Sequence, residues 1–353
     1  MMKACIWKFS LLLAVLALVG ISPSSAAAVS SSSPGFAWAW GKNLHGQLGN
    51  NSASDAQLPV AVQMPENVTF TTISGGHENS LALDTTGQVW AWGDNGFGQL
   101  GNNSTDKSLV PVAVQMPENV TFTTVSAGSD HSLALDTAGQ AWAWGGNTDG
   151  QLGSDSMQKA LVPVAVQMPT NVVFTAISAG RQTSLALDAA GDAWAWGGNG
   201  FGQLGNNSTE RSLVPVAVQM PTNVTFTAIS VGYDHSVALD SAGFAWAWGN
   251  DEYGELGTNI RTNGRTPVAV QMPASVTFTT ISAGYAYSLA LDTGGHGWGW
   301  GYGELGNNNT GNGTSFVERA QAPVEVRMPT NATFTMISAG MYHGLALQPA
   351  IDL

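Results

Sequence analysis

One unit of 52 residues is written six times along this chain. A Trp-Gly pair recurs at this interval from Trp40 to Trp300, and the phrases PVAVQMP and SAG recur with it in close variants. A short repeat cannot bury its apolar face alone, so neighbouring copies must pack against one another. The repeat therefore restricts the fold to arrays and rings of identical small units.

Each copy contains four short extended segments bounded by Pro, Gly, Asn or Asp. In one copy they are PVAVQMP from Pro59, VTFTTIS from Val68, SLALD from Ser80 and QVWAWG from Gln88. Alternating side chains and β-branched residues favour strands, and the short DTTG link favours a hairpin. Four antiparallel strands per repeat of this length predict an all-β fold, a β-propeller of four-stranded antiparallel blades. The paired tryptophans are expected to fill its core.

The two ends of the chain are complementary. The chain opens with FAWAWG at Phe36, a fourth strand without the first three, and finishes with the first three strands, ending GLALQPAIDL. We therefore predict a closed six-bladed propeller over residues 36–353, with the N-terminal strand completing the last blade and leaving no exposed edge. The last copy carries a shortened turn, GYGELG, and the insertion NNNTGNGTSFVERAQ, which is predicted to be a loop.

The first 28 residues are predicted to be a secretory signal peptide. Basic MMKACIWK precedes apolar FSLLLAVLALVGI, and SPSSAAA offers a small-residue cleavage site near Ala28. Residues 29–35 would be a short linker, and the protein would be secreted, periplasmic or extracellular, with no membrane span after cleavage. Cys5 is the single cysteine, so the mature chain would have no disulfide. The formal net charge of −13 argues against nucleic acid as a partner.

The combined motif WAWGDNGFGQLGNNS…VPVAVQMP…SAGSDHSLALD resembles the repeat of the regulator of chromosome condensation family, from about Gly35 to Leu347. The resemblance implies a β-propeller. The best-known eukaryotic member has seven blades and exchanges nucleotide on a nuclear GTPase, whereas six copies are present here. Secreted propellers that resemble the family include a protein inhibitor of β-lactamases.

Two segments differ most between copies: the residues after the Trp-Gly pair and those after SAG. Strand connectivity places both at one end of the blades, while the near-constant QMPENV and DTTG turns lie at the other. Positions that vary on an exposed loop are where function is expected. The predicted binding residues after Trp-Gly are His45, Phe97, Asp149, Phe201, Tyr253 and Tyr302. Those after SAG are His77, Glu78, Asp130, His131, Arg181, Tyr233, Asp234, Tyr285, Tyr287, Tyr342 and His343.

Alternatives remain open for several of these residues. His77, His131 and His235 could instead form hydrogen bonds between blades. Asp84 and its counterparts at the start of each hairpin are expected to cap the turn rather than to bind calcium or to act as acids. No cofactor, metal site or catalytic residue is predicted, because the histidines lack metal-ligand spacing.

The sequence thus predicts a secreted, non-catalytic propeller that binds an extracellular protein through its variable loops. Binding of an extracellular glycan or cell wall is the alternative, and a propeller hydrolase remains open. A hydrolase would need a carboxylate cluster on the variable loops.

Overall fold

The computed structural model describes residues 37–303, 305–306, 318–328, 332–340 and 344–347. These residues form strands, turns and bends, and no helix within them is long and apolar enough to cross a membrane. The predicted signal peptide and linker, and most of the predicted insertion loop, lie outside this part of the chain.

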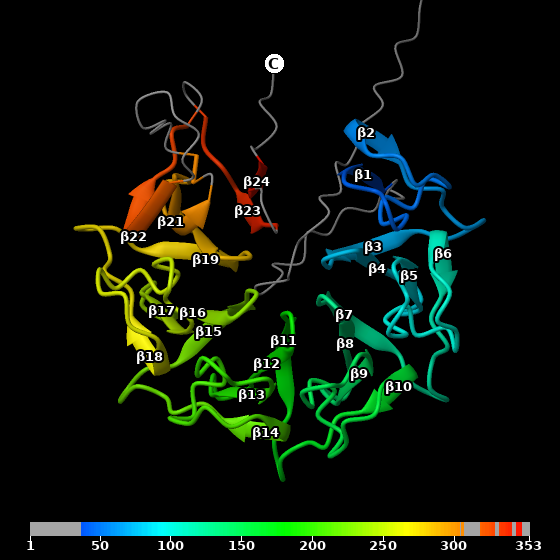
Figure 1. Ribbon diagram of the computed structural model, residues 1–353, viewed down its shortest axis with the longest axis horizontal. Coiled ribbons are helices and arrows are strands. Elements are labelled where there is room, and N and C mark those ends of the chain that lie inside the picture. The colour runs from blue at the N-terminus through cyan, green and yellow to red at the C-terminus, as the bar shows by residue number, and fades with distance from the viewer. Residues whose placement is uncertain (1–36, 304, 307–317, 329–331, 341–343, 348–353) are drawn as a thin grey trace, which may run out of the picture.

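Five four-stranded antiparallel sheets are arranged as blades around a common axis (Figure 1). They are β3 (Phe70–Gly75), β4 (Asn79–Asp84), β5 (Val89–Gly93) and β6 (Ser108–Ala113); β7 (Phe122–Ala127), β8 (His131–Asp136), β9 (Ala141–Gly145) and β10 (Ala160–Ala165); β11 (Phe174–Ala179), β12 (Thr183–Asp188), β13 (Ala193–Gly197) and β14 (Ser212–Ala217); β15 (Phe226–Val231), β16 (His235–Asp240), β17 (Ala245–Gly249) and β18 (Gly264–Ala269); β19 (Phe278–Ala283), β20 (Tyr287–Asp292), β21 (Gly297–Gly303) and β22 (Glu318–Glu325). The predicted all-β propeller is confirmed.

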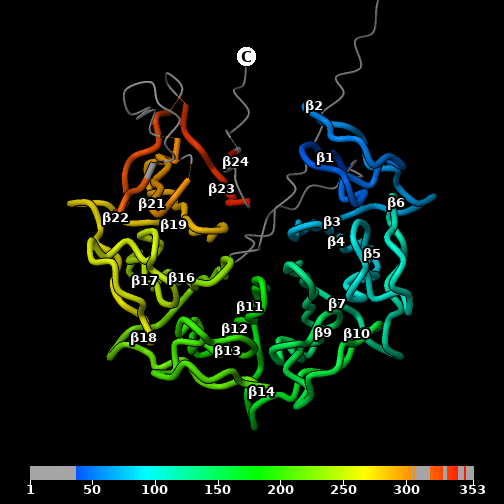
Figure 2. The backbone as a smooth tube through the Cα atoms, viewed as in Figure 1, coloured from blue at the N-terminus to red at the C-terminus, as the bar shows by residue number. Residues whose placement is uncertain are grey.

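The remaining strands form two two-stranded sheets at the ends of the chain. β1 (Trp38–Gly41) pairs with β2 (Ala56–Ala61), and β23 (Met336–Ala339) pairs with β24 (Gly344–Leu347). Together they provide the four strands of a sixth blade. The predicted six blades are confirmed. Among the described residues β1 and β24 belong to separate sheets and lie apart in Figures 1 and 2, so closure of the ring by their pairing stays a prediction.

The order of strands within a blade also corrects the sequence prediction. The PVAV strand pairs with the preceding Trp-Gly strand, as β5 with β6, and not with the VTF strand that follows it. It forms the outer edge of its blade, where a proline such as Pro111 is tolerated because that edge needs no ladder hydrogen bond. The QMP segment then crosses to the innermost strand of the next blade. The chain consequently begins with the last two strands of a blade and ends with the first two.

The two tryptophans of each pair make different contacts. Trp144 is fully buried and stacks on Phe122 of its own blade, with ring centroids 6.3 Å apart and planes at 20°. Its Nε1 donates to the carbonyl oxygen of Gln99 in the preceding unit at 2.9 Å. Trp142 is half-buried, and its Nε1 donates to the Asp136 carboxylate at 3.0 Å. One tryptophan therefore joins neighbouring blades, and the other joins strand to turn.

On five inner strands, a serine links its strand to the next blade. The Oγ of Ser126 accepts a hydrogen bond from the backbone N–H of Ala179 at 3.0 Å, and Ser178 accepts one from Val231 in the same way. Both serines are fully buried, so these bonds satisfy groups that water cannot reach. These bonds join neighbouring blades close to the SAG loops.

Candidate functional site

The loops after SAG and after Trp-Gly lie at the same end of each blade, as predicted. Within a blade, the backbone N–H of Asp94 donates to the carbonyl oxygen of Glu78 at 2.8 Å, and that of Gly146 donates to Asp130 at 2.7 Å. The loops approach so closely that a Cβ on Gly145 would lie 2.5 Å from the Asp130 carbonyl oxygen. We call the surface made by the β3–β4 and β5–β6 loops, with their counterparts, the variable-loop face.

The side chains of this face meet in sites between neighbouring blades. Each of these interblade sites joins the turn after one Trp-Gly pair to the loops of the next blade. The first and the fifth occupy equivalent positions in the repeat, because His45 corresponds to Tyr253 and Asp94 to Tyr302. They differ completely in chemistry.

The first interblade site is ionisable throughout. His45 Nε2 lies 3.4 Å from Glu78 Oε2, and His45 Nδ1 lies 3.5 Å from Asp94 Oδ1. Asp94 also accepts a hydrogen bond from Gln99 Nε2 at 2.8 Å. The two carboxylates face opposite nitrogens of the ring, so they do not converge on one point where a cation could bind. Within the described residues no group of three His, Cys, Asp or Glu has the arrangement of a metal site.

The fifth interblade site is aromatic and cationic. The rings of Tyr253 and Tyr302 lie with centroids 5.0 Å apart. The Cζ of Arg319 lies 4.9 Å from the Tyr253 centroid and 5.3 Å from that of Tyr302. Contacts of this length are cation–π interactions, which stabilise more strongly when the groups are partly removed from water.

A second cluster of the same kind lies on the inner loops. Arg181 Cζ is 4.3 Å from the ring centroid of Tyr233, and the Tyr233 and Tyr285 centroids are 4.2 Å apart. These residues come from the β11–β12, β15–β16 and β19–β20 loops, on three consecutive blades. All tyrosines of the chain lie after residue 232, and all arginines after residue 180. The two clusters form what we call the Tyr/Arg sector, comprising Arg181, Tyr233, Tyr253, Tyr285, Tyr302 and Arg319.

Two carboxyls of the inner loops lie near Arg181. Burial raises the pKa of Asp130, and the charges of His77 and Arg181 oppose this effect while Asp94 and Glu78 add to it. Burial also raises the pKa of Asp234, again against the charge of Arg181. Neither carboxylate forms an ion pair with Arg181 among the described residues.

The remaining predicted loop residues are also on this face. Phe97 and Phe201 are exposed, with 41% and 39% of their surface accessible. Asp149 Oδ1 lies 3.5 Å from Nη1 of Arg211 in the next blade, and the same nitrogen donates to the Thr148 carbonyl oxygen at 3.1 Å. His77 is exposed on the loop after β3.

Two predicted binding residues are instead buried between blades. His131 is fully buried, and its Nε2 hydrogen-bonds to Ser184 Oγ of the next blade at 2.9 Å. Tyr287 is 3% exposed, and its hydroxyl donates to the Gly340 carbonyl oxygen at 2.9 Å. His235 repeats the His131 contact with Ser288 at 3.0 Å. This repeat position points into the gap between sheets, so the interblade alternative is correct for these residues. Tyr342 and His343 lie outside the described residues.

Burial is the physical reason that these histidines are neutral. It lowers the pKa of His131 to about 3 and that of His235 to about 4. A neutral imidazole can bond to a serine hydroxyl without a counter-ion, whereas a buried cation would need one. Their role is structural.

The fifth turn contains a pair of buried carboxyls that the sequence prediction did not single out for this role. Earlier copies carry Asn and Gln where this turn has Asp251 and Glu255, each 1% exposed. Asp251 Oδ1 accepts from the Leu256 N–H at 3.0 Å, and Glu255 Oε2 accepts from the Tyr253 N–H at 2.7 Å. Burial raises the pKa of Glu255 to about 7, with smaller contributions from Asp251 and Glu252. The exchange of amide for carboxyl at matched positions was the available sequence clue.

Arg319 was also missed, because it lies at the end of the irregular insertion rather than in either variable segment. Its counterparts, four residues before the proline of the outer strand, are Asp55, Lys107, Lys159, Arg211 and Asn263. A comparison of this position across copies would have shown a mostly basic rim.

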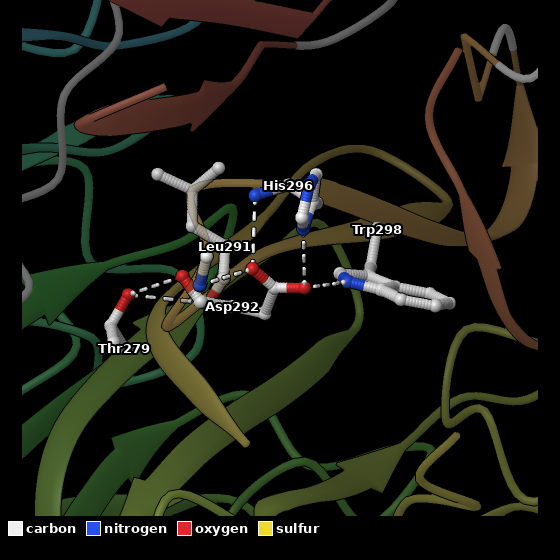
Figure 3. A network of polar contacts seen from close by, with 6 residues as sticks. Thr279, Leu291, Asp292, His296 and Trp298 are labelled. Atoms are coloured by element: carbon white, nitrogen blue, oxygen red, sulfur yellow. Dashed lines mark hydrogen bonds and ion pairs between the residues drawn. The ribbon is translucent and has the colours of Figure 1, made fainter. Parts of the chain in front are cut away.

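The opposite ends of the blades carry a constant network. Figure 3 shows it at Asp292, whose Oδ2 accepts from Trp298 Nε1 at 3.0 Å and whose Oδ1 accepts from the backbone N–H of His296 at 2.9 Å. Only in this copy does a histidine side chain join, with His296 Nδ1 3.2 Å from Asp292 Oδ2. Asp84, Asp136, Asp188 and Asp240 make the same bonds to turn and tryptophan. The predicted turn-capping role is confirmed, and we call this surface the constant-turn face.

Known proteins resemble the chain in sequence and in fold. The sequence model of the RCC1-like domain matches residues 11–346. The ultraviolet-B receptor UVR8 of Arabidopsis thaliana is 26% identical over 328 residues, which cover 93% of this chain and 74% of that protein. The probable E3 ubiquitin-protein ligase HERC6 of Homo sapiens is 33% identical over 65% of this chain, but the match spans only 23% of the ligase.

Among solved structures, yeast RCC1 (Prp20) in its complex with Kap60 matches with a TM-score of 0.76 at 22% identity, covering 88% of this chain and 76% of that one. This likeness shows that the two chains share the propeller fold.

Proposed function

The chain belongs to the RCC1-like domain family, and from this premise we propose that it is an exported, non-catalytic propeller that binds a protein through its variable-loop face. RCC1-like propellers are protein-interaction modules, and the solved complex of Prp20 with Kap60 is one instance. The observation that carries the proposal is the Tyr/Arg sector. Tyrosine and arginine are the residue types that most often supply binding energy at protein interfaces.

A folding role common to all copies does not account for this sector. The scaffold contacts repeat from copy to copy, as the serine, tryptophan and turn-aspartate bonds do. The Tyr253–Tyr302 pair, by contrast, has His45 and Asp94 as its equivalents in the first site. Residues that differ this much at one repeat position are free of the shared packing constraint. They are available for recognition.

Export is supported by the sequence of residues 1–28, and it sets the compartment of the partner. To test it, the full chain is expressed with a C-terminal tag, and the N-terminus of the exported product is sequenced. Cleavage near Ala28 is expected, and a protein that stays in the cytoplasm with Met1 intact would contradict export.

The binding proposal is tested by pull-down from the extracellular medium of the native host, followed by identification of the bound protein. Joint replacement of Tyr233, Tyr253 and Tyr285 by Ala should abolish capture while the melting temperature stays close to that of the wild type. Glu118→Ala, on the exposed constant-turn face, should leave capture intact. Neighbouring Asn119 is unsuitable as a control because its φ of 58° lies in the left-handed region, where alanine is strained. If Glu118→Ala abolished capture and the tyrosine replacements did not, the partner would bind the constant-turn face and the proposal would be wrong.

A further inference from the structure

The guanidinium groups of Arg181 and Arg319 are held against tyrosine rings, at 4.3 Å and 4.9 Å, without any hydrogen bond or ion pair to a residue in the described part of the chain. A guanidinium has five N–H donors in the plane of the group. Stacking covers a face of that plane and leaves the donors at its edge available. Both side chains thus lie against tyrosines, and no described residue uses their guanidinium donors.

Two other arginines of the same face are bonded to neighbouring loops. Arg211 donates to the Thr148 carbonyl oxygen and pairs with Asp149. Arg261 Nε donates to the Glu252 carbonyl oxygen at 3.0 Å. These two arginines fasten one loop segment to another. Arg265 is exposed and also has no side-chain partner among the described residues, but it does not lie over a tyrosine ring. Arg181 and Arg319 are therefore distinguished by unused donors combined with a tyrosine contact.

We propose that Arg181 and Arg319 receive carboxylates from an acidic segment of the partner protein, a proposal that rests on the protein-binding function above. The planar fork of a guanidinium matches a carboxylate with two parallel hydrogen bonds, which are stronger than neutral ones. The tyrosines immobilise the fork beforehand, so less side-chain freedom is lost on binding. The adjoining rings offer apolar surface to the residues beside the acidic one.

The charge of the chain limits what this segment can be. A net charge of −13 repels a polyacidic partner at long range. Asp130 and Asp234 also lie near Arg181, so its charge is partly compensated. The segment should therefore carry one or two Asp or Glu residues among apolar residues. Arg319 should contribute more of the affinity than Arg181.

The test uses the full chain and a displayed library of random peptides, selected on the wild type. Selected peptides should contain Asp or Glu beside Leu, Phe or similar residues. In a fluorescence-polarisation titration, Asn or Gln in place of the acidic residue should weaken binding by about tenfold or more. Arg319→Gln should cause a similar loss, Arg319→Lys should restore only part of it, and the matched control Arg211→Gln should leave affinity unchanged. Thermal melts confirm that each variant is folded.

Several outcomes would overturn the proposal. Selected peptides without acidic residues would do so, as would affinity that is unaffected by Arg319→Gln and Arg181→Gln together. A uronic-acid oligosaccharide that binds the sector where acidic peptides fail would identify a glycan as the occupant. If the natural partner is lost with the three tyrosine replacements but retained with both arginine replacements, protein binding stands and the carboxylate proposal fails.

Discussion

At the constant-turn face, an aspartate accepts the same hydrogen bonds in five successive blades, from Asp84 to Asp292. At the variable-loop face, equivalent positions carry His45 between two carboxylates in the first interblade site and Tyr253 beside Tyr302 and Arg319 in the fifth. Both faces belong to the same strands and the same repeat.

The difference lies in where the polar groups find partners. The turn aspartates are satisfied within their own hairpin, so a change there costs stability in any blade. In the Tyr/Arg sector no described residue uses the guanidinium donors, so a change there should weaken binding. The predictions below test this separation, in order of the expected change in stability.

The largest loss is expected from the scaffold that both faces share. Trp144→Ala should lower the free energy of unfolding by about 3–5 kcal/mol, because it leaves a cavity against Phe122 and removes a bond to the preceding unit. Urea denaturation of the two variants Trp144→Ala and Trp142→Ala measures the effect. Trp142→Ala should lower the free energy of unfolding by less, because Trp142 is only half-buried. Equal losses in the two variants would contradict the different roles assigned to the two tryptophans.

Glu255 is expected to be a structural residue within the variable-loop face. Its pKa of about 7 exceeds the ordinary 4.5, so the folded state holds the proton more tightly and stability declines as pH rises between these values. Glu255→Gln should therefore be more stable than the wild type above pH 7, by about 3 kcal/mol, and equal to it near pH 4. Unfolding at both pH values tests the sign.

Gln99→Glu is the matched control for this prediction. It places a carboxylate against Asp94, which now accepts a bond from Gln99 Nε2 at 2.8 Å. Its stability should fall as pH rises, the opposite of the change expected for Glu255→Gln. If the stability difference from the wild type did not change with pH in either variant, ionisation of a carboxyl at this repeat position would not affect stability.

A smaller loss should follow from a single change at the constant-turn face. Asp136→Ala removes acceptors for Trp142 Nε1 and for the backbone N–H groups of Ala138 and Gln140. About 1–3 kcal/mol should be lost, because partly buried donors are left unpaired. Asp188→Ala should give a similar value by thermal denaturation. Very different values would mean that the blades do not share this network equally.

The smallest stability effect is expected from exposed aromatic residues of the variable-loop face. Phe97→Ala and Phe201→Ala should each change stability by about 0.5 kcal/mol or less, because 41% and 39% of these residues is accessible. Differential scanning calorimetry of each variant measures this. A loss comparable to that of Asp136→Ala would make them scaffold residues and blur the contrast between the two faces.

The repeat allowed the fold to be predicted because periodic strands and turns depend on local chemistry. The alternation of VWAWG and the turn chemistry of DTTG are visible in the letters, and the structure places them in β5 and in the β4–β5 hairpin. Strand connectivity alone also placed both variable segments at one end of the blades, as the Asp94–Glu78 backbone bond confirms.

Local sequence patterns could not predict where one blade ends and the next begins, or how the two ends of the chain meet. Which neighbour the PVAV strand joins is decided by packing at long range, and it joins the Trp-Gly strand. At the ends of the chain, Trp38 Nε1 is buried without a partner in the described residues, whereas its counterpart Trp90 donates to Asp84 at 3.0 Å. The sequence has Gln348 where the other copies have this aspartate.

The sequence by itself determined the propeller, its repeat length and the face on which the chain varies, since these follow from periodicity and turn chemistry. Tertiary structure decided which variable residues are accessible: His131 and Tyr287 are buried between blades, whereas Arg181 and Arg319 lie against tyrosines from neighbouring blades. The physical reason is that these contacts join residues about 50 or more positions apart, brought together only when one blade packs on the next.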